Sequence, residues 1–267
     1  MAKKLRLDQH LLRRNLVLSR QQAQLLIRAG KVRDENGKVL DKPGLLISEE
    51  IKIELKESPE FVSRGGQKLV HALKEFQIDV SGKVCLDAGI STGGFTDCLL
   101  QKGALKIYGI DVGYGQIAWT LRNDSRVILR ERTNLRNLSP EILYNVDDIW
   151  PTFAVADLSF ISLRLVLPQI RSLIKSENSQ ALLLVKPQFE VGRERVGKGG
   201  VVRDAKAHID AINSVIMEAS VLGWYPQGIV ASPITGPAGN HEYLLWLNEK
   251  KSETVTDIEN LVEQTLN

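Results

Sequence analysis

The sequence predicts an α/β protein with a seven-stranded, mostly parallel sheet that has an antiparallel edge, preceded by a small α+β domain. From about residue 61 onward, short apolar runs alternate with glycine-rich turns and helical stretches, as in parallel strands joined by crossover helices. The expected strands are 83–86, 105–110, 127–129, 153–156 and 181–185, and the expected helices are 96–102, 116–121, 162–175 and 204–222. Two last runs, 224–231 and 242–248, follow a single helix and predict the antiparallel pair.

The first residues of the chain predict two short helices. Leu7 and Leu11 mark one amphipathic helix, and Ser19 with Gln22 three residues later forms a capping box that begins a second. Gly30 predicts the C-terminal end of that second helix, because glycine readily adopts the left-handed backbone of a helix terminus.

A turn, a strand and a boundary complete this region. Asn36-Gly37 predicts a tight hairpin turn, and apolar residues alternating from 51 to 55 predict a strand. The Ser58-Pro59 step is the expected boundary, because proline interrupts the preceding strand. The chain is thus divided into a small domain at 1–58, a linker at 59–64, a larger domain at 65–250 and a tail at 251–267.

Positive charge is concentrated in the small domain. From Lys3 to Arg33 there are nine basic residues and a single acid, Asp8, although the net charge of the chain is only +3. A solvated helix face is the simpler interpretation of such a run. Confinement of the charge to one small folded unit favours a polyanionic partner instead.

Nothing in the sequence indicates a membrane or an export signal. The longest apolar runs, such as 181–185, are far too short to cross a bilayer, and no apolar segment of signal-peptide type follows the basic start. Cys85 and Cys98 are interpreted as reduced core residues. We therefore expect a cytoplasmic protein without stable membrane association.

The strongest local motif is the glycine-rich turn from Asp87 to Phe95, directly after the first expected strand of the larger domain. Glycines let a backbone approach a ligand closely, and the helix N-terminus that follows attracts polar or negative groups. Asp111, at the end of the next strand, is placed to accept hydrogen bonds from a ribose diol. An ordinary tight turn with a capping acid is the alternative. The order of the two elements favours a nucleoside-bearing cofactor, of which S-adenosylmethionine is one.

Four further polar residues stand out by position: Lys68, Asp157, Lys186 and Glu242. Asp157 and Lys186 follow two expected strands, and ligands of open α/β sheets bind beyond the carboxyl ends of strands. For each residue alone, a surface charge or a structural ion pair is the simpler interpretation. The four histidines are widely scattered, so no metal site is expected, and His241 is interpreted as structural.

Two resemblances give these patterns more content. The arrangement of Arg6-Leu7-Asp8, Ser19-Arg20 and Gly30 resembles the RNA-binding (alpha-L) domain named after ribosomal protein S-four. The rest resembles the FtsJ-like ribose methyltransferases. The whole chain up to about Lys251 closely resembles the TlyA family of rRNA 2′-O-methyltransferases, historically also named haemolysins. The motifs that carry this resemblance are 63–66, the glycine turn, 131–134, 186–190 and 197–204.

The resemblance implies a Rossmann-like, S-adenosylmethionine-dependent domain that methylates a ribose 2′-hydroxyl, of cytidine, in the rRNA of ribosomal subunits. It also implies a catalytic set of Lys68, Asp157, Lys186 and Glu242. We expect Lys186 to act as a base or as a cation beside the developing alkoxide, and Asp157 to orient it, while the other two hold the nucleotide. The residues expected to contact the cofactor are Asp87, Gly89, Ser91, Thr92, Gly93, Gly94, Phe95, Asp111, Val112, Asn134 and Asp157.

One departure from the family pattern is Ile90, where alanine is more usual; a larger side chain there is expected to narrow the cofactor pocket. The segment 192–204 is glycine-rich and basic, and it is either a flexible surface loop or a loop that closes over RNA. The expected RNA contacts are Arg6, Arg14, Arg20, Arg28, Lys31, Arg64, Arg193 and Lys198. Two other functions stay open: a membrane-active, haemolysin-like protein, and a non-catalytic RNA-binding factor of ribosome assembly.

Overall fold

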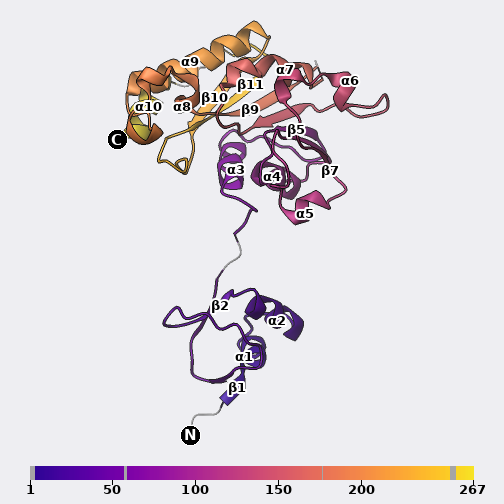
Figure 1. The fold of residues 1–267 in the computed structure, drawn as a ribbon, viewed down its shortest axis with the longest axis vertical. Helices are drawn as coiled ribbons and strands as arrows, with labels where there is room; N and C mark the ends of the chain where they lie inside the picture. Colours follow the sequence, from indigo (N-terminus) through magenta and orange to yellow (C-terminus); the bar gives the residue numbers. More distant parts are fainter. Residues whose placement is uncertain (1–3, 57–58, 176, 253–256) are drawn as a thin grey trace. The chain divides into compact units, whose positions relative to one another are not determined.

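The computed structural model describes residues 4–56, 59–175, 177–252 and 257–267 (Figure 1). The chain forms two compact units, Met1–Glu60 and Phe61–Asn267. Ser58, at the boundary expected from the sequence, lies outside the described residues.

The smaller unit combines two helices with four short strands. The elements are β1 (Lys4–Arg6), α1 (Leu7–Arg13), α2 (Arg20–Arg28), β2 (Val32–Asp34), β3 (Leu46–Ser48) and β4 (Ile53–Leu55). β1 pairs with β3 and β2 with β4, both antiparallel. Leu7 and Leu11 from α1 and Ala23 and Ile27 from α2 are fully buried in one apolar core.

The start and end of α2 follow the expected signals. The Ser19 hydroxyl accepts a hydrogen bond from the Gln22 backbone N–H at 3.1 Å, and the Gln22 side chain accepts one from the Leu18 N–H at 2.8 Å. The capping box is therefore present, with its return bond displaced by one residue toward the N-terminus. Gly30 adopts φ 68°, so the predicted helix end is confirmed.

The larger unit contains the predicted seven-stranded sheet. Its strands are β5 (Val84–Ala88), β6 (Lys106–Ile110), β7 (Val127–Arg130), β8 (Phe153–Ala156), β9 (Gln180–Val185), β10 (Tyr225–Ala231) and β11 (Tyr243–Asn248). They lie in the order β10-β11-β9-β8-β5-β6-β7, with β11 antiparallel to both of its neighbours. The mostly parallel sheet and its antiparallel edge are thus confirmed.

Helices cover both faces of this sheet (Figure 1). One face packs against α3 (Gly65–Glu75), α4 (Gly94–Gln101) and α5 (Trp119–Arg122), and the other against α7 (Leu167–Ser172), α9 (Ala205–Val221) and α10 (Ile258–Leu266). Short helices lie at α6 (Pro140–Leu143) and α8 (Pro187–Glu190), and single 3₁₀ turns at η1 (Leu135–Asn137), η2 (Leu163–Leu165), η3 (Arg193–Arg195) and η4 (Lys198–Gly200). Within the described ranges, no helix has both the length and the apolar character needed to cross a membrane.

Three element bounds differ from those expected. The helix expected at 162–175 is divided into η2 and α7, since Pro168 has no N–H with which to continue the first turn. The helix expected at 116–121 is reduced to the single turn of α5. β5 extends to Ala88, so Asp87 lies inside the strand rather than after it.

The larger unit begins earlier than the sequence predicts, and the last residues of the chain form a helix of that unit. Phe61 is 3% exposed and packs in the core beside α3 and α4, so the larger unit already begins within the expected linker. At the other end, α10 packs against α9 and β10 and buries Val262 completely. In the C-terminal segment the apolar residues Ile258, Leu261, Val262 and Leu266 fall at helical spacing, a signal that the sequence reasoning missed. Phe61 is a single buried side chain and belongs to no such pattern.

We expect Phe61→Ala to lower the free energy of unfolding of the larger unit by about 3 to 5 kcal/mol, because it leaves a cavity in that core. Val62→Ala, at a residue that is 38% exposed, is the matched control and should cost far less. Thermal and urea unfolding followed by circular dichroism measure both effects. Equal losses for the two variants would show that Phe61 belongs to a linker.

Candidate functional site

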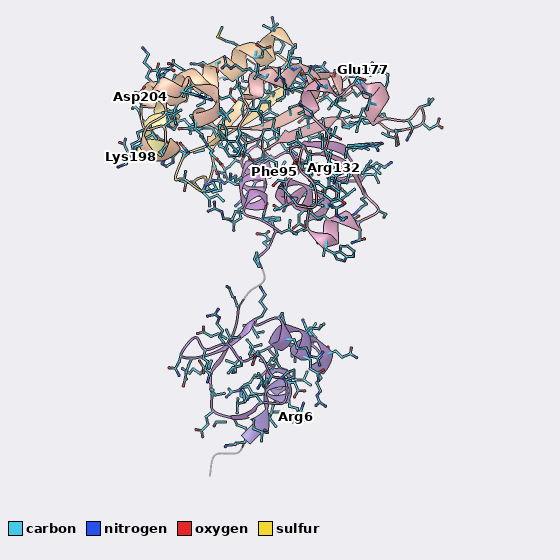
Figure 2. The ribbon with its side chains drawn as sticks, viewed as in Figure 1. Arg6, Phe95, Arg132, Glu177, Lys198 and Asp204 are labelled. Atoms are coloured by element: carbon cyan, nitrogen blue, oxygen red, sulfur yellow. The ribbon has the colours of Figure 1, made fainter. Side chains whose placement is uncertain are left out.

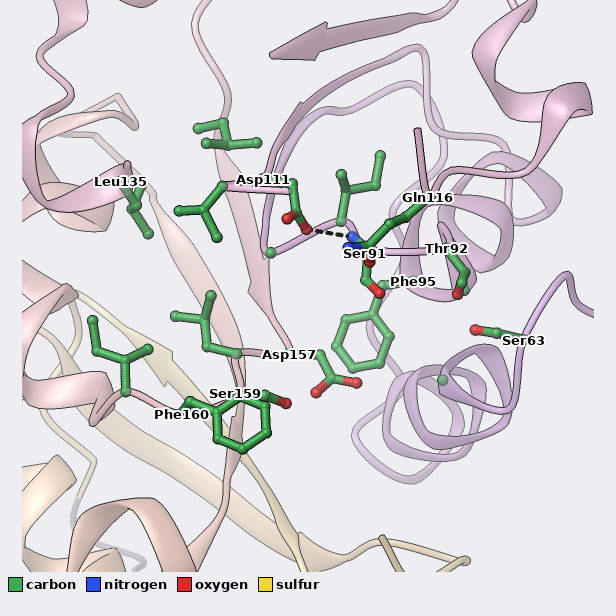
Figure 3. A pocket seen from close by; sticks show the side chains of 18 of the residues that line it. Ser63, Ser91, Thr92, Phe95, Asp111, Gln116, Leu135, Asp157, Ser159 and Phe160 are labelled. Atoms are coloured by element: carbon green, nitrogen blue, oxygen red, sulfur yellow. Dashed lines mark hydrogen bonds between the residues drawn. The ribbon is translucent and has the colours of Figure 1, made fainter. Parts of the chain in front are cut away.

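A cavity of about 690 Å³ lies at the carboxyl ends of the parallel strands. β5 is flanked by β6 on one side and by β8 on the other, so the segments that leave β5 and β8 diverge and leave a crevice between them. The lining comes from segments that follow β5, β6, β7, β8 and β9, together with the start of α3, Pro237 and Glu242. Figure 3 shows part of this lining, with Ser91, Asp111, Leu135 and Asp157 among the labelled side chains.

Two glycines of the turn after β5 adopt a backbone conformation that would be strained for any other residue type. Gly89 and Gly93 adopt φ 88° and 96°, which side chains disfavour. A Cβ on Gly89 would lie 2.6 Å from the Leu158 side chain and 3.2 Å from the carbonyl oxygen of Asp157. A Cβ on Gly93 would overlap Leu121. Gly89 therefore lets β5 and β8 approach each other at the cavity, while Gly93 serves packing and does not line it.

Asp111 joins the glycine turn to the loop after β6. One carboxylate oxygen accepts a hydrogen bond from the Ser91 N–H at 2.7 Å (Figure 3), and the other accepts one from the Gly113 N–H at 2.7 Å. The carboxylate lines the cavity, as the sequence predicts. Since each carboxylate oxygen can accept more than one hydrogen bond, the predicted ribose contact is compatible with these bonds.

Asp87 lies beneath the turn and does not line the cavity. Its Oδ2 accepts a hydrogen bond from the Thr96 hydroxyl at 2.6 Å, whereas its Oδ1 is buried and has no hydrogen-bond partner. Burial raises the pKa of Asp87 to about 7. The sequence predicts a direct contact between Asp87 and the cofactor. In the structure β5 continues through Asp87, so its side chain lies beneath the cavity lining and not in it.

The four predicted catalytic residues line the same cavity and form two ion pairs. Lys186 Nζ lies 2.5 Å from Asp157 Oδ1 and donates a hydrogen bond to the Ser159 hydroxyl at 3.0 Å. Lys68, on α3, pairs with Glu242 at 2.5 Å across 174 residues of sequence. Both lysine side chains are 8% exposed, so each pair is largely shielded from water.

The other residues predicted to contact the cofactor divide into two groups. Thr92, Gly94 and Phe95 line the cavity at the start of α4. Val112 and Asn134 line it from the far side, where Val112 is 70% exposed and the Asn134 side chain accepts a hydrogen bond from the Arg136 N–H.

Ile90 is accommodated by a glycine on the neighbouring strand. Its side chain is 3% exposed and packs over Gly109 of β6, where a Cβ would overlap it. Ile90 also lines the cavity, so only the part of its side chain that faces the cavity can narrow the cofactor pocket.

Sequence reasoning missed two lining residues that directly follow Asp157 and Leu158. Ser159 accepts the Lys186 hydrogen bond, and Phe160 is 92% exposed with φ 65°, a backbone conformation rare for an aromatic residue. The Phe160 and Phe189 rings are 5.3 Å apart. The sequence did contain a signal for them, because a serine and an aromatic residue follow the acid at the end of the strand 153–156.

Two arginines of the smaller unit, Arg6 and Arg20, pair with the buried Asp8. Asp8 accepts hydrogen bonds from Arg6, Arg20 and Gln24, while the two arginine side chains stay 42% and 51% exposed (Figure 2 labels Arg6). These hydrogen bonds hold the pKa of Asp8 well below its usual range, against the opposing effect of burial. Arg14 and Arg28 are exposed, and Lys31 is half-buried.

The basic residues of the larger unit lie at two places. Arg64 is exposed and lines the cavity at the N-terminus of α3. Arg193 and Lys198 are exposed in the segment 192–204, where Figure 2 labels Lys198 and Asp204. That segment is anchored, since Arg195 pairs with Asp204 and Asp210.

The histidines give no common site. His208 is fully buried and bonded through its two ring nitrogens to Tyr243 and to the Val202 carbonyl, and burial lowers its pKa. Within the part of the chain that the structure describes, no group of three or more His, Cys, Asp and Glu residues could hold a metal ion.

Comparison with known proteins identifies the family. A model described as FtsJ-like methyltransferase matches residues 61–249. A Mycobacterium tuberculosis protein named 16S/23S rRNA (cytidine-2′-O)-methyltransferase TlyA is 48% identical over 258 residues, which cover 96% of this chain and 94% of the relative. The chain belongs to the TlyA family of FtsJ-like methyltransferases.

Other TlyA-family relatives carry a different name. Hemolysin A of Brachyspira hyodysenteriae is 40% identical over 90% of this chain and 98% of its own. A solved structure of a Streptococcus thermophilus protein named as a hemolysin is 39% identical, with a TM-score of 0.72 over 99% of this chain and 96% of that one.

The buried Asp87 carboxyl makes a pH-dependent contribution to stability. The unfolded chain releases this proton near pH 3.9 and the folded protein near pH 7, so between these values the folded state binds the extra proton and stability falls as the pH rises. We expect Asp87→Asn to gain stability relative to the wild type from pH 4 to pH 8, by on the order of 3 kcal/mol.

Urea unfolding at several pH values measures this difference, with Asp79→Asn as the control for loss of an exposed carboxylate. A wild-type-to-variant difference that stays flat from pH 4 to pH 8 would show that Asp87 ionises alike in both states.

Proposed function

We propose that this protein transfers a methyl group from S-adenosylmethionine to a ribose 2′-hydroxyl, of cytidine, in ribosomal RNA. The observation that carries the proposal is the convergence of the glycine turn and both lysine–carboxylate pairs on one cavity. The family match and the name of the relative from M. tuberculosis support the same reaction. We further propose that the RNA is methylated within ribosomal subunits in the cytoplasm, where the buried Cys85 and Cys98 stay reduced.

The cavity suits a cofactor that carries a nucleoside and an amino-acid portion. Asp111 would accept hydrogen bonds from the hydroxyls of the cofactor's ribose, and Val112 and Asn134 would lie beside the cofactor's base. The unpartnered Oδ1 of Asp87 is buried beneath the turn, where it stays available to accept a further hydrogen bond. When bound, S-adenosylmethionine supplies an electrophilic methyl group on its sulfonium.

The protein's own residues then position and activate the attacking hydroxyl. Asp157 holds Lys186 in a fixed orientation, and the lysine's positive charge stabilises the negative charge that develops on the ribose oxygen. The hydroxyl proton passes to solvent water at the open side of the cavity. A cation held in place before the reaction costs little reorganisation during it. The Lys68–Glu242 pair also lines the cavity, where it would hold the target ribose.

RNA recognition is divided between positively charged and aromatic groups. The guanidinium groups around Asp8 would contact phosphates, which gives affinity and register rather than base identity. At the cavity, the exposed Phe160 ring offers a stacking surface for a base taken out of its helix.

The hemolysin name of two relatives keeps a membrane-active function as the competing hypothesis. Purified protein incubated with radiolabelled S-adenosylmethionine and ribosomal subunits separates the possibilities. Label in rRNA supports the enzyme, lysis of erythrocytes without label supports the membrane-active protein, and RNA binding with neither supports a non-catalytic assembly factor.

We expect Lys186→Ala to lower the rate of methyl transfer at least about 100-fold, because the developing alkoxide loses its fixed cation. Cofactor affinity, measured by calorimetry, should change by less than about threefold. Lys102→Ala, at an exposed lysine after α4, is the control and should keep full activity. Retained turnover in Lys186→Ala would exclude this lysine from the reaction.

Removing Arg20 and Arg28 together should weaken RNA binding and reduce the slope of log K against log salt by about 1 to 2, because fewer phosphates are neutralised. The control is the double change Lys74→Ala and Lys102→Ala, which removes the same charge from the C-terminal ends of α3 and α4. Filter binding at several salt concentrations measures the slope, and an unchanged slope would refute a phosphate role for this helix.

A further inference from the structure

The buried carboxylate of Glu190 belongs to neither ion pair of the cavity. It joins the two segments that carry Asp157 and Lys186. Glu190 is the last residue of α8, four residues after Lys186, and its side chain is 1% exposed. It is not among the residues that line the cavity. Burial raises the pKa of Glu190, so placing a carboxylate here has a cost that its contacts must offset.

The contacts of Glu190 reach the segment that follows Asp157. The Ser162 hydroxyl donates to one carboxylate oxygen at 2.5 Å, and the Leu163 backbone N–H donates to the other at 2.7 Å. Arg164 approaches the carboxylate at 3.5 Å and donates to the Glu190 main-chain carbonyl at 3.0 Å. These bonds tie the segment after β8 to the one after β9.

Two further contacts act between the same segments. Lys186 donates to Ser159, and the Phe160 ring packs against that of Phe189. Phe160 itself holds a left-handed backbone, which persists only where neighbouring structure restrains it. The Glu190 bonds begin two residues later, at Ser162, and supply that restraint from the C-terminal side.

We propose that Glu190 is a positioning residue for methyl transfer, which fixes the Asp157 segment against the Lys186 segment without touching the substrate. This inference depends on the proposed function. The Lys186–Asp157 pair is formed by residues from two different strand ends, so its geometry varies with the separation of those ends. A displacement of ~1 Å at a reacting group can cost ~100-fold in rate.

The chain contains a control residue, Glu249, at the end of the sheet away from the cavity, where the parallel strands begin. Glu249, just after β11, accepts hydrogen bonds from Arg171 at 2.9 Å, from the Asn178 N–H at 2.9 Å and from the Ser179 hydroxyl at 2.6 Å. Its partners are of the same kinds as those of Glu190: an arginine, a backbone N–H and a serine. β11 begins near the cavity and ends away from it, so Glu249 lies far from the reaction.

The experiment compares Glu190→Ala, Glu190→Gln and Glu249→Ala with the wild type in single-turnover methylation of rRNA. Glu190→Ala should slow transfer about 10- to 100-fold, with a cofactor dissociation constant within about threefold. Glu190→Gln should recover much of the rate, because its amide oxygen still accepts from Leu163. Glu249→Ala, at a carboxylate that is 25% exposed, should lower the melting temperature but keep the rate. Equal losses of rate in the two alanine variants would overturn the proposal.

A second measurement does not depend on activity. Modification of Lys186 by an amine-acylating reagent, followed by mass spectrometry of peptides, should accelerate in Glu190→Ala and not in Glu249→Ala. If Glu190→Ala fails to fold, Ser162→Ala removes one bond of the set and should give a smaller loss of rate. Failure of wild-type protein to methylate rRNA would sink the proposed function, whereas unchanged acylation of Lys186 would sink this inference alone.

Discussion

The reversal of strand order at β5 is the constraint on which the site depends. Because the chain builds β5, β6 and β7 in one direction and then returns to place β8 on the other side, the segments leaving β5 and β8 separate and open a crevice. Four strands deliver their carboxyl ends to this edge, and each end carries a different function: the glycine turn, Asp111, Asp157 and Lys186. Gly89 then lets the two central ends approach closely enough to share a ligand.

The sequence predicts those features whose chemistry is local. Glycines in a turn, acids at strand ends and a serine cap each act on neighbouring backbone, so spacing alone locates them, and the alternation of strands and helices predicts the sheet. Pairings between distant residues leave no such trace. Lys68 and Glu242 meet across 174 residues, and nothing near either one indicates the other. Phe61 was missed for a related reason, since a single buried side chain produces no period. The helix around Val262 could have been predicted, because Ile258, Leu261, Val262 and Leu266 fall at helical spacing.

Several of the buried charged groups in this protein belong to small hydrogen-bonded sets. Asp8 orients two arginines, Glu190 receives a serine, a backbone N–H and an arginine, and each cavity lysine has its own carboxylate. A buried charge is costly unless it is paired and hydrogen-bonded, so each set also fixes the geometry of its members. The basic run of the smaller unit thus contains an ordered cluster, beyond the solvated face that its composition suggested.

The antiparallel strand β11 has a consequence for folding during synthesis on the ribosome. Its first residue directly follows Glu242, whose partner Lys68 lies on the first helix of the same unit. β11 also lies between β9 and β10, so until it is in place β10 has no neighbour in the sheet. A chain still being synthesised can form the glycine turn and the Lys186–Asp157 pair early. The Lys68–Glu242 pair can form only when residues 242–248 have left the ribosome, so this part of the cavity lining is completed last during synthesis.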